Sequence, residues 1–263
     1  MSEEKSGGGI SLATKSRYET PENFFPVVVD DFFNNPEALV DFGKSLPKEG
    51  EDRQPGKRTQ NLWEIDHNLC RAILLKIMSC YYDLDYIDLE WNNSILKFQE
   101  IPRFSENKND VRNKGWIHQD STIGEYQLAG LIYLTPDIDP DSGTSLYNVK
   151  STKSNKIYKT ILAKDTLFKD GYFDKEEYTK NYIKHEEYFF EKLRVHNIFN
   201  RLIMYDTQEW HRANNYYNGD DKDVRLTLGF FIGGMSETPL NRIKNTEFDS
   251  AIKLQIENRK YEN

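Results

Sequence analysis

Hydrophobic and polar positions in the first third of the chain predict one strand followed by two helices. Residues 24–33 are rich in valine and phenylalanine, which is typical of a strand. An asparagine and a proline then supply a helix N-cap and a first helical residue, so we expect a helix over 36–46. Residues 43–60 have the glycine, proline and polar content of a loop. Apolar residues then recur every fourth position, which predicts a second helix over 62–81.

From about residue 86 the pattern changes to short β-branched and aromatic runs separated by turn residues. Most of these runs follow one another without a helix between them, which favours an antiparallel sandwich or barrel. The predicted strands are 86–91, 94–101, 126–134, 144–149, 193–199, 201–205 and 224–232. The expected fold class is therefore mainly β, with flanking N-terminal helices that brace the sheet.

Three segments fall outside this pattern. Residues 150–194 are too long for a sandwich loop, and aromatic residues at helical spacing follow Asp174, so we expect a helical insertion that acts as a lid or a substrate-facing wall. Residues 1–20 have no apolar periodicity and are expected to form a flexible tail. A further helix is expected around 246–259. Residues 21–263 are then expected to form a single domain.

Composition narrows the class of protein and of partner. No apolar run approaches the ~20 residues that cross a bilayer, and residues 1–10 lack the features of a secretory signal, so we expect a cytoplasmic protein without a membrane span. Cys70 and Cys80 are too few for a disulfide framework and are interpreted as core thiols. The 35 basic and 43 acidic residues give a net charge of −8, which argues against nucleic acid as a partner. A peptide, protein or small-molecule substrate is favoured, and the oligomeric state is not indicated.

The first candidate chemistry is a histidine and an aspartate two residues apart. In an extended segment, His118 and Asp120 point to the same side and offer an imidazole nitrogen and a carboxylate together. This triplet arises often by chance, so alone it is normally interpreted as a polar strand end in a loop.

The second candidate group lies about 100 residues later. Asn218 and a glycine lie midway between His211 and Arg225, in a segment of strong turn composition, so a hairpin would place the histidine opposite the arginine. Arg225 begins an apolar strand and, if oriented inward, must meet an anion. The alternative is that it points outward and pairs with Asp220, Asp221 or Asp223.

Two imidazoles and one carboxylate on one face of a metal leave three coordination positions open, which suits non-haem iron(II) used with dioxygen. Two open positions can take a chelating keto acid, the third can take dioxygen, and a nearby arginine can hold the far carboxylate of the acid. With these residues in this order, the chain resembles the prolyl-4-hydroxylase-like branch of the iron(II)/2-oxoglutarate dioxygenases. The pattern of that branch is His-x-Asp, a distant His, and then Arg-x-Ser/Thr.

The resemblance implies a double-stranded β-helix, or jelly roll, over about residues 90–233. It implies that the iron ligands and catalytic residues are His118, Asp120 and His211. It also implies that Arg225 and Tyr133 bind the C5 carboxylate of the co-substrate 2-oxoglutarate, with Thr227 as a hydroxyl helper. A simple core aromatic remains an alternative for Tyr133. The implied reaction consumes dioxygen, releases succinate and carbon dioxide, and hydroxylates a substrate, with a prolyl or other peptidyl residue as the leading candidate.

The chain departs from the pattern of that branch in three places. The strand before His-x-Asp has no clear tyrosine, and Phe98 or Gln99 stands in its place. A serine precedes Gly143 where a glycine pair is usual, and the insertion at 150–194 is not general. Two other interpretations stay open. One is a zinc-dependent hydrolase that uses the same three ligands, and the other is a non-catalytic jelly-roll binding protein.

Overall fold

The computed structural model describes residues 24–50, 55–86, 88–120, 126–150, 157 and 174–236. The predicted tail at 1–20, the predicted helix at 246–259 and most of the insertion before residue 174 lie outside these residues. None of the helices within the described ranges combines the length and the hydropathy that crossing a bilayer requires.

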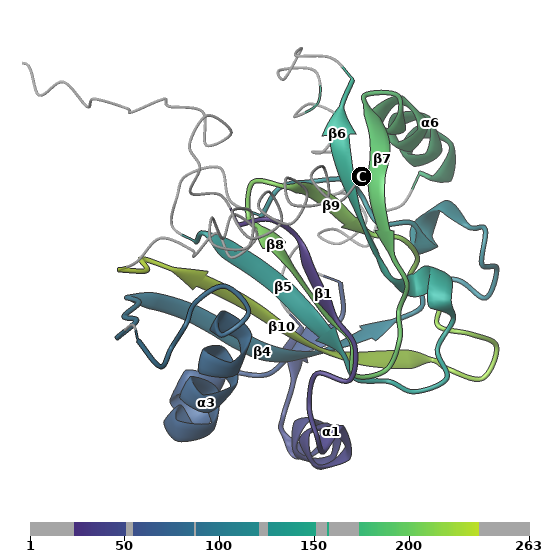
Figure 1. Cartoon of the computed structure of the whole chain (residues 1–263). Coiled ribbons are helices and arrows are strands. Elements are labelled where there is room, and N and C mark those ends of the chain that lie inside the picture. The colour runs from purple at the N-terminus through teal and green to yellow at the C-terminus, as the bar shows by residue number, and fades with distance from the viewer. Residues whose placement is uncertain are drawn as a thin grey trace, which may run out of the picture.

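Two antiparallel sheets form the body of the molecule (Figure 1). The larger sheet has the strand order β1 (Val27–Val29), β8 (Leu202–Asp206), β5 (Leu128–Tyr133), β10 (Val224–Gly233), β4 (Asn93–Pro102), β3 (Lys57–Arg58) and β2 (Glu49–Gly50). The smaller sheet has the order β7 (Phe189–Val195), β6 (Thr144–Val149) and β9 (Trp210–Ala213). An isolated bridge between His118 and His211 adds one more segment beside β9.

From β4 onward the chain alternates between the two sheets. Strands β4, β5, β8 and β10 belong to the larger sheet, while the His118 segment, β6, β7 and β9 belong to the smaller one. In chain order, the segments belong to the larger, smaller, larger, smaller, smaller, larger, smaller and larger sheet. This is the double-stranded β-helix, so the predicted fold class, mainly β with flanking helices, is confirmed. The alternation places segments about 90 residues apart side by side.

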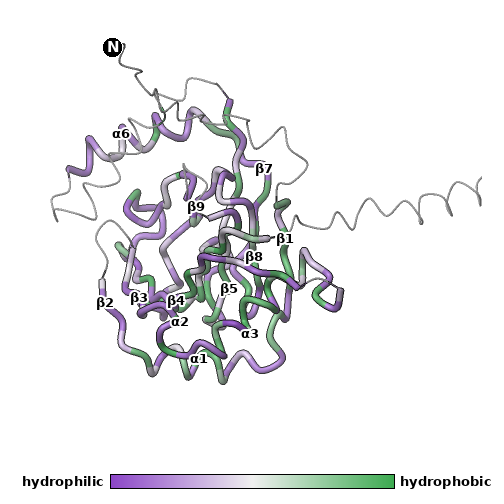
Figure 2. The backbone as a smooth tube through the Cα atoms, turned by 90° about the vertical axis from the view of Figure 1, so that its left-hand side faces the viewer, coloured by the Kyte–Doolittle hydropathy of each residue, from purple (hydrophilic) through white to green (hydrophobic). Residues whose placement is uncertain are grey.

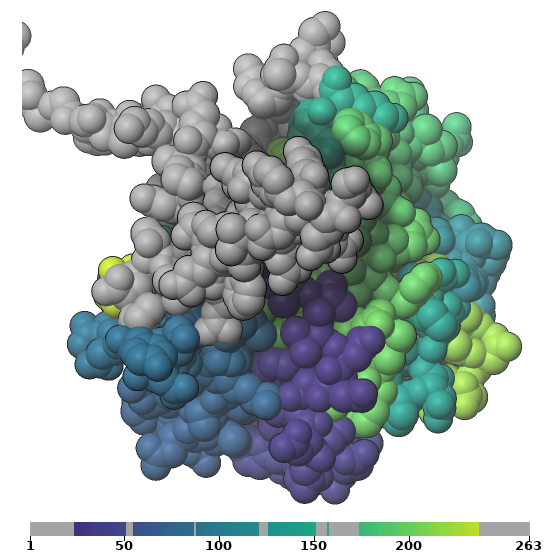
Figure 3. Space-filling model, viewed as in Figure 1, coloured from purple at the N-terminus to yellow at the C-terminus, as the bar shows by residue number. Residues whose placement is uncertain are grey.

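Three helices cover the face of the larger sheet that points away from the smaller sheet (Figures 1 and 2). They are α1 (Pro36–Ser45), α2 (Leu62–Ile65) and α3 (His67–Met78). In the space-filling view, the purple and blue residues of this N-terminal part form the lower surface, and the green residues of β7 and α6 (Lys175–Glu186) lie on the right (Figure 3). The structure also contains two short 3-10 turns, Val111–Asn113 and Pro140–Ser142.

The main apolar core lies between these helices and the larger sheet. Strand β10 shows the period of two that defines the two faces of the sheet. Its residues that pack into this core are Leu226, Leu228, Phe230 and Ile232. Its residues that line a cavity on the other face are Arg225, Thr227, Gly229 and Phe231. The hydropathy colouring shows the same division, with green backbone where the sheet meets the helices and mostly purple backbone along α6 (Figure 2).

The prediction of one continuous helix over 62–81 is wrong, because the helix is interrupted at Asp66. That residue has extended backbone angles (φ −148°, ψ 91°), and its carboxylate accepts a hydrogen bond of 2.9 Å from the backbone N–H of Leu69. An aspartate side chain that caps a helix start competes with continued helix. The predicted single helix is therefore two, and the second ends at Met78.

Three strand predictions and the predicted hairpin also need correction. Residues 88–91 form no strand, and the strand expected over 24–33 is only β1. The strand expected over 193–199 is β7, which begins earlier because α6 ends at Glu186. The hairpin expected around Asn218 does not form, because β9 pairs with β6 in the smaller sheet while β10 pairs with β4 and β5 in the larger one.

Gly43 allows α1 to pack closely on the sheet. Replacing this helical glycine with alanine is therefore expected to destabilise the protein, which is the opposite of the usual effect. A Cβ atom at Gly43 would lie 2.5 Å from a ring carbon of Phe98, which is fully buried. Alanine normally stabilises a helix interior by about 1 kcal/mol relative to glycine, but overpacking a core costs about 1–3 kcal/mol. We expect Gly43→Ala to lower the free energy of unfolding in urea, whereas Lys44→Ala on the exposed face of the same helix leaves it nearly unchanged. A Gly43→Ala variant as stable as the parent would contradict this packing.

Candidate metal centre

Two histidines far apart in the chain are held together by their own backbones. The N–H of His118 donates to the carbonyl of His211, and the N–H of His211 donates to the carbonyl of His118, both at 2.9 Å. The two imidazole ring centroids lie 4.5 Å apart. Because a bridged pair has a fixed register, both side chains project from neighbouring positions of the smaller sheet.

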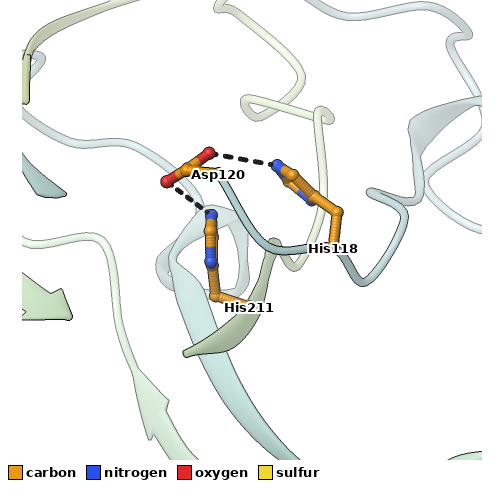
Figure 4. A group of neighbouring side chains, drawn as sticks. All are labelled: His118, Asp120 and His211. Atoms are coloured by element: carbon orange, nitrogen blue, oxygen red, sulfur yellow. Dashed lines mark ion pairs between the residues drawn. The ribbon is translucent and has the colours of Figure 1, made fainter. Parts of the chain in front are cut away.

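Asp120 completes a cluster of three potential metal ligands. Its backbone N–H donates to the carbonyl of Thr207 at 3.2 Å. Its carboxylate oxygens lie 3.6 Å from Nε2 of His118 and 3.2 Å from Nε2 of His211. One ligand atom from each of the three residues lies within 4.8 Å of the others. Figure 4 shows both imidazoles directed at the carboxylate. The structure thus brings together the three residues that the sequence singled out.

Both imidazoles are oriented by a second hydrogen bond. Nδ1 of His118 lies 2.8 Å from the carbonyl oxygen of Trp116, and Nδ1 of His211 lies 2.9 Å from that of Glu209. A carbonyl oxygen only accepts, so each Nδ1 is the donor, and a ring that gives up its other proton to bind a metal offers the lone pair of Nε2. Histidines that bind metals are held in this way by backbone carbonyls.

The carboxyl group of Asp120, at the centre of the cluster, is ionised. Burial by itself would raise the pKa of Asp120, but the charge of His211 and the hydrogen bond from His118 outweigh burial and hold that pKa well below its usual range. The group is therefore a carboxylate at physiological pH. Two imidazole nitrogens and a carboxylate oxygen form a donor set for a divalent transition metal.

A cavity of about 500 Å³ lies between the two sheets beside this cluster. Such a volume is in the range of sites that bind small molecules. All six candidate site residues line it, namely His118, Asp120, His211, Tyr133, Arg225 and Thr227. The predicted pairing of Arg225 with His211 in a hairpin is wrong, yet both residues reach the same cavity because they face each other from opposite sheets.

Arg225 points into the cavity and is 2% exposed. Its Nη1 donates to the carbonyl of Asn215 at 2.7 Å and to Oδ1 of Asn218 at 3.2 Å. Its Nε has no hydrogen-bond partner among the described residues, and none of their carboxylates forms an ion pair with it. Burial lowers the pKa of this guanidinium. The alternative of outward pairing with an aspartate is wrong, because Asp223 pairs instead with Arg103 at 2.7 Å.

Tyr133 and Thr227 lie opposite each other on β5 and β10. Both are buried, and the hydroxyl of Tyr133 donates to Oγ1 of Thr144 at 2.9 Å. Burial raises the pKa of Tyr133 to about 12, so the phenol keeps its proton. Tyr133 also packs in a small apolar cluster with Leu146, so it is both a core aromatic and a residue of the cavity wall.

Of the two residues that stand in place of the missing tyrosine, Gln99 lines the cavity and Phe98 lies in the main core. Tyr126 and Tyr205 also line the cavity. The ring of Tyr205 lies 4.6 Å from that of His211.

Sequence reasoning missed Tyr216, Arg58 and Lys97 as wall residues. Tyr216 lies under the guanidinium of Arg225 at 5.6 Å, in a segment whose asparagines and glycine indicated only a turn. The period of two along the strand predicted at 94–101 could have assigned Lys97 to the face of Gln99.

The helix of the insertion does not serve as the expected lid or substrate-facing wall. No described residue of α6 lines the cavity. Instead, α6 packs behind the histidine segments, where Tyr178, Tyr182 and His185 contact the ring of Trp116. Trp116 does not line the cavity either, because its indole faces this helix.

Solved structures similar to this chain include several oxygenases. One is a prolyl hydroxylase from Trichoplax adhaerens in complex with a hypoxia inducible factor peptide fragment (12% identity, 80% of this chain, 83% of that chain, TM-score 0.42). A second is HygX from Streptomyces hygroscopicus with nickel and 2-oxoglutarate bound (11% identity, 80% and 83%, TM-score 0.48). A third is a Pseudomonas putida prolyl-4-hydroxylase (9% identity, 80% and 92%, TM-score 0.41). Likeness at this level says nothing about the reaction of this chain.

By sequence, the chain matches no curated protein. A family of sequences with the description "Family of unknown function (DUF6445)" matches residues 15–232, which is more than half of the 263 residues. The chain therefore belongs to the DUF6445 family.

Proposed function

We propose that this protein is a non-haem iron(II)- and 2-oxoglutarate-dependent dioxygenase that hydroxylates an organic substrate and releases succinate and carbon dioxide. One observation carries the proposal. A cluster of two imidazoles and a carboxylate shares a cavity with a buried arginine that has no carboxylate partner among the described residues. The first group suits a transition metal, and the second suits the free carboxylate of a metal-chelating keto acid.

The residues present fit a ferrous ion. His118 and His211 direct Nε2 at the carboxylate of Asp120, and each ring is held by a carbonyl behind it. Three protein ligands would leave positions for a bidentate keto acid and for dioxygen. When bound, ferrous iron supplies the activation of dioxygen that oxidises both the keto acid and the substrate. The protein holds the ligands in place.

Arg225 and Tyr133 would bind the C5 carboxylate of 2-oxoglutarate, with Thr227 beside them. A buried guanidinium without an anion costs several kcal/mol, so an incoming carboxylate satisfies a group that the fold leaves unsatisfied. The phenol of Tyr133 is protonated, and its single O–H, which donates to Oγ1 of Thr144, can turn to the carboxylate and add a hydrogen bond to those from Arg225. In this proposal residues 21–263 form one dioxygenase domain, and a prolyl or other peptidyl residue is the leading substrate because of the resemblance of the His-x-Asp, His and Arg-x-Thr pattern.

The cavity gives less support to a zinc hydrolase. Such an enzyme needs a general base near the metal-bound water, and Asp120 is the only carboxylate among the described residues that line the cavity. As a ligand it would not be free to act as the base. Arg225 would also have no role.

The most informative experiment measures succinate released from 2-oxoglutarate by the iron-loaded protein. Proline-containing peptides, free amino acids and short nucleic acids are supplied in separate reactions. We expect a peptide to raise succinate release, because the net charge of −8 disfavours nucleic acid. No succinate above the metal-free control with any substrate would count against the proposed reaction.

His211→Ala should abolish iron retention, because it removes one of three protein ligands. Metal content after desalting and succinate release are the two measurements. His196→Ala is the matched control, since His196 is exposed and lies outside the cavity lining. If His211→Ala retains iron and produces succinate at the parent rate, His211 is not a ligand.

Arg225→Leu should weaken 2-oxoglutarate binding far more than iron binding. The lost charge-assisted hydrogen bonds are worth about 1.5–3 kcal/mol, or roughly 10- to 150-fold in affinity. Calorimetry on the iron-loaded protein under nitrogen measures this change, and Arg194→Leu removes an exposed arginine as the control. Unchanged affinity for 2-oxoglutarate in Arg225→Leu would place the anion site elsewhere.

A further inference from the structure

Helix α6 contacts both chain segments that carry the histidines of the metal centre. It begins after Asp174, whose carboxylate accepts from the backbone N–H groups of Glu176 and Glu177 at 3.0 Å. Most of its surface is polar and exposed, and Ile183 is 56% exposed. One face is different. Its residues that contact the body of the protein are Lys175, Tyr178, Tyr182, His185 and Glu186, spaced as one side of a helix.

The first contact is with the two residues before His118. Nε2 of His185 donates to the carbonyl of Ile117 at 2.7 Å, and the indole N–H of Trp116 donates to the hydroxyl of Tyr178 at 2.5 Å. The ring of Trp116 also lies 5.1 Å from that of His185. His185 is fully buried, and burial lowers its pKa to about 4, so the ring is neutral and its single proton lies on Nε2.

These contacts are connected to the ring of His118 by one further hydrogen bond. The carbonyl of Trp116 is the acceptor that orients the ring of His118 through Nδ1 at 2.8 Å. The helix therefore holds the residue whose carbonyl sets the direction of the His118 lone pair. An acceptor that is fixed in place fixes the ring that donates to it.

The second contact is with the residue after His211. Nη1 of Arg212 donates to the hydroxyl of Tyr182 at 2.5 Å and to the carboxylate of Glu186. Its guanidinium also lies 5.2 Å from the ring of Tyr147 on β6. One face of α6 thus joins the His118 segment to β9 from behind, while the two histidines join them by backbone hydrogen bonds in front.

We propose that α6 is a positioning element of the metal centre, in which His185 and Tyr182 hold the His118 and His211 segments through the Ile117 carbonyl and Arg212. This inference rests on the proposed function, because it assigns a role toward the metal that the cluster would bind. His185 and Tyr182 are positioning residues and do not touch the reacting atoms. Loss of their hydrogen bonds is expected to weaken metal binding even when the β-helix remains folded.

The test measures metal affinity in full-length protein. Cobalt(II) serves as the probe, because its visible spectrum reports the geometry of its ligands, and its dissociation constant is obtained by titration. His185→Leu removes the donor to Ile117 and should lower affinity about 10- to 100-fold, the usual cost of losing a residue that orients a ligand. His185→Gln keeps an amide N–H at the position of Nε2 and should restore most of the affinity. Ile183→Ala, on the exposed face of the same helix, should match the parent.

The outcomes separate this inference from the proposed function. If the parent binds no cobalt, the metal site itself is wrong and the role of α6 falls with it. If the parent binds but His185→Leu binds equally well with the parent spectrum, the positioning role is wrong and the metal site stands. Thermal unfolding of the metal-free proteins shows whether His185→Leu folds. If it does not, Tyr182→Phe decides, because a reduced affinity supports the role and the parent affinity overturns it.

Discussion

Two hydrogen bonds between the backbones of His118 and His211 are the constraint on which the site depends. They connect residues 93 positions apart in the chain, and they exist because the double-stranded β-helix places the His118 segment beside β9. Asp120 follows two residues later, so the same short segment contributes a carboxylate to the cluster. The positions of all three side chains therefore follow from one pairing of the backbone. A change that separated the two segments would disperse the entire donor set.

A second constraint acts from the opposite sheet. Strand β10 presents its apolar residues to the helices and its alternate residues to the cavity, and Arg225 is the first of the latter. Burial of this cation among neutral hydrogen-bond acceptors leaves part of it unsatisfied. Such an arrangement is costly for folding and advantageous for binding an anion. The cluster of His118, Asp120 and His211 and the buried guanidinium of Arg225 thus belong to different sheets, and the β-helix alone brings them to one cavity.

The sequence predicted the fold class because a period of two marks strands. It also predicted six site residues, from the resemblance of His-x-Asp, a distant His and Arg-x-Thr to a known family, and all six line the cavity. Prediction from the sequence failed where packing between distant segments decided which local structure forms. Asp66 capped a new helix within an unbroken apolar stripe, and β9 paired across the molecule with β6 and not with β10. Likewise, helical spacing revealed α6 but could not show which side of the metal centre it covers, because that depends on packing against Trp116 and Arg212.

The proposed function requires that one cavity binds ferrous iron and 2-oxoglutarate together. Visible absorption of the protein under nitrogen tests it most directly, since a keto acid chelated to iron(II) gives a charge-transfer band that neither component gives alone. We expect a band when 2-oxoglutarate is added to the iron-loaded protein, no band with succinate, and loss of the band when air is admitted. A protein that binds iron yet shows no band at saturating 2-oxoglutarate would contradict it.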